Sequence, residues 1–152
     1  MKVNPLRLFA PSLAPRFKLV AFCLAAFAPA QDGWASVLKA LRDGAFFLST
    51  GEVLMPRFMI GGRQSGETLK VGPEGRAKLE AVLSWTFPMS FAEVVTGDGK
   101  KVYRERIDLS HTGAFGKQTL EKELDLKGKS WVRLEAWDVA TNGVISQPLW
   151  LE

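Results

Sequence analysis

The chain of 152 residues contains only one cysteine, Cys23, and one histidine, His111. A disulfide framework is therefore excluded, and the fold must be stabilised by its hydrophobic core. A zinc site of the usual kind is excluded as well, because it needs three or four converging cysteine, histidine or acidic ligands. Carboxylates alone can bind calcium, but the sequence has no Asp-x-Asp-x-Asp-Gly loop.

A surplus of positive charge is also missing from most of the chain, although the sequence pI is about 9.4. Residues 1–30 hold four basic residues and no acidic residue, so residues 31–152 hold 16 of each sign. A protein that binds nucleic acid needs an excess of lysine and arginine to neutralise phosphates. We therefore expect no nucleic-acid partner.

No apolar run reaches the roughly 20 residues that a membrane-spanning helix needs. The longest run, residues 19–28, follows basic residues and ends in the small-residue pattern Ala-Pro-Ala at residues 28–30. This arrangement predicts a secretory signal peptide over residues 1–30 and export to the periplasm or the outside of the cell. The alternative is an apolar N-terminal helix of the mature fold. A lipid anchor on Cys23 is disfavoured, because the preceding residue, Phe22, is bulky.

One short helix is predicted over residues 33–43. Asp32 can cap its first turn, and Gly44 can end it. Its apolar residues recur at the spacing of a single helical face, at Trp34, Val37, Leu38 and Leu41.

The rest of the chain has the pattern of β-strands separated by turns. Strands are predicted over residues 45–50, 53–60, 67–71, 76–85, 91–96, 101–109, 120–126, 131–139 and 144–151. Gly97-Asp98-Gly99 and Thr141-Asn142-Gly143 are typical of hairpin turns, while Pro56 and Pro148 indicate a bulge or an edge. The pattern predicts a mainly β fold, an immunoglobulin-like antiparallel β-sandwich of seven or eight strands preceded by one short α-helix.

Residues of catalytic type are few. Asp108, Ser110 and His111 lie within four positions of one another, but a catalytic triad needs side chains that converge in space. We interpret them as residues of a hydrogen-bonded loop. Glu121 and Glu123 share the polar face of a strand whose other face is leucine, so we interpret them as solvated.

Aromatic side chains are the richest feature, with five tryptophans and ten phenylalanines. Trp131 and Trp137 share one face of the predicted strand 131–139, opposite an apolar face. If that face is exposed, the two rings can stack on a ligand; alternatively they cover the core or an interface. Four aromatic residues are the candidate ligand or partner contacts: Trp131, Trp137, Trp34 and Phe46.

Residues 33–53 resemble the end of a PHP-type metal-dependent hydrolase domain. In that family a closing helix of the form x-x-Leu-x-Ala-Leu-Arg-x-Gly leads into a last barrel strand that ends in Ser/Thr-Thr-Gly. The stretches that begin at Trp85, Gly97 and Trp131 resemble the sandwich appended to CehA/McbA-like metallohydrolases. The resemblance covers residues 33–152.

The resemblance implies a hydrolase ancestry, yet the metal-binding His-x-His pair and the late Asp-x-His of the family are absent. It therefore implies a chain that is not an enzyme, with no cofactor and no catalytic or metal-binding residue. Residues 31–52 would be a remnant of the barrel, and residues 53–152 an accessory sandwich. Residues 34–41 and 45–49 would then leave apolar surface unpaired, suited to a separate PHP catalytic chain or to self-association.

Two other hypotheses stay open at this point. An exported binding module could recognise a glycan or a surface partner through exposed aromatic residues, without a stable membrane span after signal cleavage. An enzyme with an unfamiliar site would need convergent side chains with shifted pKa values in a cleft.

Overall fold

The computed structural model describes residues 33–152, so the predicted signal peptide over residues 1–30, with Cys23, lies outside the described residues. The described part is mainly β, with one helix, α1 (Gly33–Asp43), and eleven strands. Within it, no helix has both the length and the apolar character needed to cross a membrane.

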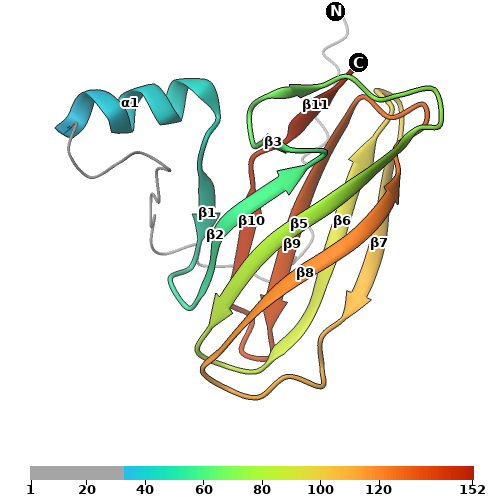
Figure 1. Ribbon diagram of the computed structural model, residues 1–152. Coiled ribbons are helices and arrows are strands. Elements are labelled where there is room, and N and C mark those ends of the chain that lie inside the picture. The colour runs from blue at the N-terminus through green and yellow to red at the C-terminus, as the bar shows by residue number, and fades with distance from the viewer. Residues whose placement is uncertain (1–32) are drawn as a thin grey trace, which may run out of the picture.

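The strands form two sheets that face each other as a β-sandwich (Figure 1). The small sheet has the order β3-β2-β5-β8, and its strands are β2 (Val53–Ile60), β3 (Arg63–Gln64), β5 (Arg76–Trp85) and β8 (Gly116–Asp125). The large sheet contains β1 (Phe47–Ser49), β4 (Thr68–Leu69), β6 (Met89–Gly97), β7 (Val102–Asp108), β9 (Trp131–Asp138), β10 (Gly143–Ser146) and β11 (Leu149–Leu151).

Strand β9 is the centre of the large sheet. On one side it pairs with β6, which pairs with β7 at the edge. On its other side the two ends of β9 pair with different strands: β10 leads on to β1, and β11 leads on to β4. The contact between β11 and β4 is parallel, and the other pairs are antiparallel.

The predicted β-sandwich with one preceding helix is confirmed, and the predicted bounds of α1, β2 and β5 match the structure. The strand count is higher than the predicted seven or eight, for two reasons. The predicted last strand is divided by Pro148, which has no N–H for a ladder, into β10 and β11. Strand β3 has only two residues, too few to give a recognisable alternation, whereas β4 lies within the predicted strand 67–71.

Two local predictions are also confirmed. The register between β2 and β5 shifts between Leu54 and Arg57, which places a bulge at Pro56. Strands β6 and β7 form a hairpin closed by a hydrogen bond from the Asp98 N–H to the Lys101 carbonyl, 3.2 Å.

The core lies between the two sheets. Strand β5 alternates as predicted, with Leu79, Ala81, Leu83 and Trp85 buried. The largest fully buried side chains come from both sheets and from the segments between their strands: Met55, Ile60, Leu79, Leu83, Met89, Leu126, Leu134 and Leu149.

The first strand corrects one expectation from the sequence. Residues 45–49 were expected to leave apolar surface unpaired, whereas β1 is hydrogen-bonded to β10 and Phe47 is only 3% exposed. Leu48, between the buried residues Phe47 and Ser49, is half-buried, so only one face of β1 is fully covered. Strand β1 is therefore an integral part of the sandwich, because its Phe47 side chain joins the common core.

Three tryptophans lie directly opposite a glycine on the neighbouring strand. In each pair a Cβ atom on the glycine would lie 2.4 Å from an atom of the indole. Since contacts this short do not occur, each ring occupies the space that only glycine leaves open. The pairs are Trp85 with Gly116, Trp131 with Gly97, and Trp137 with Gly143.

The substitution Gly116→Ala should destabilise the fold. The Trp85 ring opposite is 8% exposed, and its indole N–H donates to the Gly113 carbonyl at 2.8 Å, so it has little room to move. Overpacking of this kind costs about 1–3 kcal/mol, to be measured by urea unfolding. Gly72→Ala is the matched control, because no other atom lies within 4 Å of the added Cβ. Equal free energies of unfolding for the two variants would contradict the packing argument.

Candidate functional site

The four aromatic candidates from the sequence lie in three different parts of the chain. Trp131 and Trp137 are on the outer face of β9, and both are half-buried. They are six residues apart, about 20 Å along an extended strand. Trp34 lies on α1 and is 81% exposed, while Phe46 precedes β1 and is half-buried. The structure therefore does not bring Trp131 and Trp137 together into one contact site.

The structure adds a residue that the sequence reasoning missed. Trp150 on β11 is the register partner of Trp131 and is 49% exposed. We call these two residues the Trp131/Trp150 pair. On the other side of Trp131, its register partner on β6 is Gly97, and the partner of Gly97 on β7 is Val102. The Val102 side chain is 60% exposed. The alternation of Trp150 with Leu149 and Leu151 could have indicated its outward direction.

A network of charged side chains lies on the same face. Arg104 donates to Glu93 at 2.7 Å and to Glu135 at 3.2 Å. Arg133 donates to the other oxygen of Glu135 through Nε at 3.0 Å and Nη2 at 2.5 Å. The hydrogen bonds to Glu93 and Glu135 raise the pKa of Arg104. The Arg133 guanidinium carbon lies 5.8 Å from the Trp131 ring centroid, so the network fixes a cation beside the Trp131/Trp150 pair.

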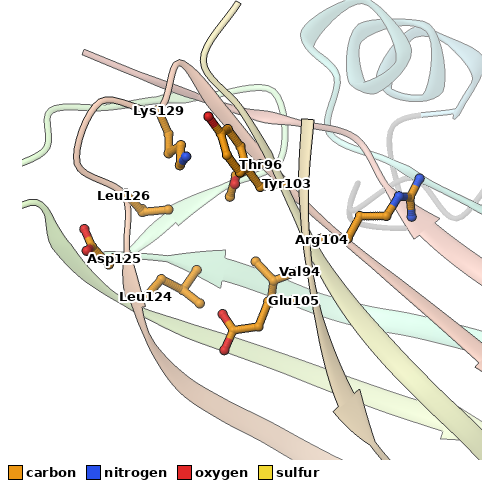
Figure 2. Close-up of a pocket in the computed structure, with 9 residues that line it drawn as sticks. All are labelled: Val94, Thr96, Tyr103, Arg104, Glu105, Leu124, Asp125, Leu126 and Lys129. Carbon is orange, nitrogen blue, oxygen red and sulfur yellow. The ribbon is translucent and has the colours of Figure 1, made fainter. Parts of the chain in front are cut away.

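A second candidate region is a pocket of about 180 Å³ at the side of the sandwich where the edge strands β7 and β8 lie. It lies between the hairpin β6–β7 of the large sheet and β8 with its following turn (Figure 2). Leu124 and Leu126 form its floor with Val94, and Lys129 lies beside Tyr103. Figure 2 shows the Arg104 guanidinium pointing away from the pocket.

The polar groups around this pocket bind one another. The Tyr103 hydroxyl donates to Asp98 at 2.8 Å, and the Lys129 ammonium lies 3.2 Å from the centroid of the Tyr103 ring. The hydrogen bond to Asp98 raises the pKa of Tyr103, so its hydroxyl remains protonated and is a poor nucleophile. Glu105 pairs with Lys122 of β8 at 2.9 Å. The Glu105–Lys122 ion pair links the edge strands β7 and β8. The side chains around the pocket do not resemble a catalytic acid–base pair.

The other candidates of catalytic type are turn and surface residues. Asp108 accepts a hydrogen bond from the Ser110 backbone N–H at 2.9 Å, which lowers the pKa of Asp108. His111 is exposed. Glu121 is also exposed and pairs with Lys78 at 2.8 Å. Among residues 33–152 no group of three His, Cys, Asp or Glu side chains could hold a metal ion.

Comparison of the chain with protein-family models, with curated proteins and with solved structures gives no match.

The carboxyl of Asp98 should titrate far below an ordinary aspartate. Hydrogen bonds from the backbone N–H groups of Lys101 and Lys100 and from the Tyr103 hydroxyl lower the pKa of Asp98 from 3.8 to about 2. A lowered pKa means that ionised Asp98 stabilises the folded state above pH 3.8, and that this contribution is lost as the pH falls toward 2.

Carbon-detected NMR of the side-chain carboxyl can measure this titration. The variant Tyr103→Phe keeps the ring and removes one donor, so the pKa of Asp98 should rise yet stay below 3.8, because both backbone donors remain. An unchanged titration in Tyr103→Phe would show that the Tyr103 hydroxyl does not bind Asp98.

Proposed function

We propose that this chain is a non-catalytic accessory β-sandwich derived from a PHP-type metal-dependent hydrolase. In this proposal it works by packing against a protein partner, either a separate PHP catalytic chain or a second copy of itself. The observation that carries the proposal is the exposed apolar face of α1. No residue of this helix is buried, and Trp34 and Leu38 are 81% and 56% exposed.

The helix is too short to be stable without cover. It has eleven residues, and isolated helices below about 12–15 residues are marginal in water. Its local contacts are modest: an exposed ion pair joins Lys39 to Asp43, and the Ser36 hydroxyl donates to the Gly33 carbonyl at 2.8 Å. Burial of a large apolar side chain contributes roughly 1.5–3 kcal/mol, so a partner that covers Trp34 and Leu38 would stabilise α1 directly.

The helix is nevertheless held firmly at its C-terminal end. The Ala45 N–H donates to the Ala40 carbonyl at 2.8 Å, and Gly44 ends the helix with a φ of 74°. A Cβ on Gly66 would lie 1.9 Å from the Asp43 carbonyl oxygen, so the helix end touches the segment between β3 and β4. The apolar face is therefore presented from a fixed point of the sandwich, which suits a specific interface.

The remaining parts of the proposal have separate support. Strands β2, β5 and β8 face β7, β6, β9 and β10, which supports an immunoglobulin-like arrangement of strands. The helix and first strand, α1 and β1, occur at the positions of the closing helix and last strand in the PHP-like stretch 33–53. The basic and apolar residues of 1–30 support export.

A second function, recognition of a glycan, is favoured by one specific observation. The Trp131/Trp150 pair places two partly exposed indoles side by side on the outer face of the large sheet.

The purified full chain should not hydrolyse phosphoester or carbamate substrates above background when Mn²⁺ or Zn²⁺ is added. The reason is that residues 33–152 contain no group of three His, Cys, Asp or Glu side chains that could hold a metal ion. Elemental analysis of the protein and a colorimetric substrate panel would check this. Stoichiometric metal with metal-dependent turnover would contradict the non-catalytic role.

The partner of α1 can be identified by site-specific photo-cross-linking in the producing cell. With p-benzoylphenylalanine in place of Leu38, we expect one dominant product, and mass spectrometry should identify a PHP-domain chain or a second copy. The same group in place of the exposed Gln118 on β8 is the control. The proposal fails if Leu38 gives no specific product, if Gln118 gives the same product, or if the captured protein is neither of these.

A further inference from the structure

The Trp131/Trp150 pair belongs to β9 and β11 and shares no residue with α1, so it is a second candidate surface. Trp131 and Trp150 are directly opposed in register on β9 and β11, so their Cβ atoms are about 5 Å apart on the same face. One side of Trp131 rests on the Gly97 backbone. This support fixes the ring as part of the surface, because it cannot collapse further into the sheet.

The hydrogen-bonding state of the indoles points to a polar ligand with an apolar face. Trp85 in the core donates its indole N–H to a protein carbonyl. Within the part of the chain that the structure describes, the indole N–H groups of Trp131 and Trp150 donate to no protein acceptor. Both side chains are partly exposed, so both indole donors are available to a ligand hydroxyl.

The charges beside the pair determine which ligands are compatible. Arg133 and Arg104 are neutralised by Glu135 and Glu93 through four hydrogen bonds. Glu135 is only 5% exposed, and its two oxygens accept from different arginines. Removing either arginine from this carboxylate in order to bind an anion would leave a buried charge unpaired, which is costly. The surface is therefore complementary to an uncharged ligand.

We infer that the outer face of the large sheet around Trp131 and Trp150 is a binding site for a neutral glycan. The apolar face of a pyranose ring would stack on the indole of Trp150 and extend toward Trp131. The two indole N–H groups would donate to sugar hydroxyls. The network of Arg104, Arg133, Glu93 and Glu135 would hold the sheet surface rigid beneath the ligand without adding net charge. This inference goes beyond the packing role of α1 and does not depend on it.

Affinity electrophoresis of the full chain through gels that contain soluble polysaccharides tests the inference. The probes are hydroxyethyl cellulose, arabinoxylan, galactomannan and laminarin as neutral glycans, with polygalacturonate as the acidic comparison. We expect at least one neutral gel to retard the protein and the acidic gel not to do so. Retardation by no neutral gel, or by the acidic gel alone, would overturn the inference.

Two substitutions connect binding with the site. Trp150→Ala should weaken binding to the retarding glycan about tenfold, the loss expected for a stacked aromatic contact, while Trp150→Phe should retain part of it. Phe115→Ala is the matched control, since it removes an aromatic ring that is 84% exposed from the segment between β7 and β8 and should leave glycan binding unchanged. Trp150 is 49% exposed, so its removal should leave the fold intact, with cooperative thermal unfolding as in the wild type.

The site assignment is wrong if Trp150→Ala binds as the wild type does or if Phe115→Ala loses binding equally. It is also wrong if Trp150→Ala instead dissociates a dimer in sedimentation velocity, because the face would then be a protein interface. The cross-link at Leu38 is unaffected by each of these outcomes, so failure of the glycan site and failure of the packing role can be distinguished.

Discussion

The sandwich depends on a steric condition, which is that a glycine must lie opposite a tryptophan on the adjacent strand. The clearest case is Trp85 with Gly116. The Trp85 indole N–H also donates to the Gly113 carbonyl. Nearby, the Thr112 hydroxyl accepts from the Met89 N–H at 2.8 Å. The Phe115 N–H donates to the Thr86 carbonyl at 2.9 Å. These contacts fix the segment by which the chain crosses from β7 in the large sheet to β8 in the small one. The Trp85–Gly116 pair therefore helps to fix the relative position of the two sheets, together with the core between them.

The same condition applies on the outside of the large sheet, where it has a different result. Trp131 and Trp137 rest on Gly97 and Gly143, so both rings remain close to the backbone and are only partly exposed. A tryptophan opposite a glycine therefore contributes both to the packing of the core and to the outer surface of the large sheet. In the core, the Trp85 ring fills the space left by Gly116. On the outer face, the Trp131 and Trp137 rings lie on glycines and stay partly exposed, within reach of a ligand.

The sequence was sufficient to predict the layers of the fold. The alternation in residues 76–85 and the Asp-Gly turn at residue 98 depend on neighbouring residues alone, and both were predicted correctly. The partnership of Trp131 with Trp150 could not be predicted, because Pro148 divides the last strand and sets the register of β11 against β9. The Arg104–Glu135 contact also joins strands that are not adjacent in the sheet order, so only the three-dimensional arrangement shows it. The functions proposed for these surfaces stay predictions.

The edge strands β7 and β8 affect how the protein can associate in solution. Strands β7 and β8 end their sheets in the described part of the chain, and the Lys122–Glu105 ion pair joins them. Unpaired strand edges are templates for amyloid-like aggregation, and charged side chains are a common protection against it. Arg104, Arg106 and Glu121 place such charges along both edges. Ordered growth of the sheets from molecule to molecule is thereby disfavoured.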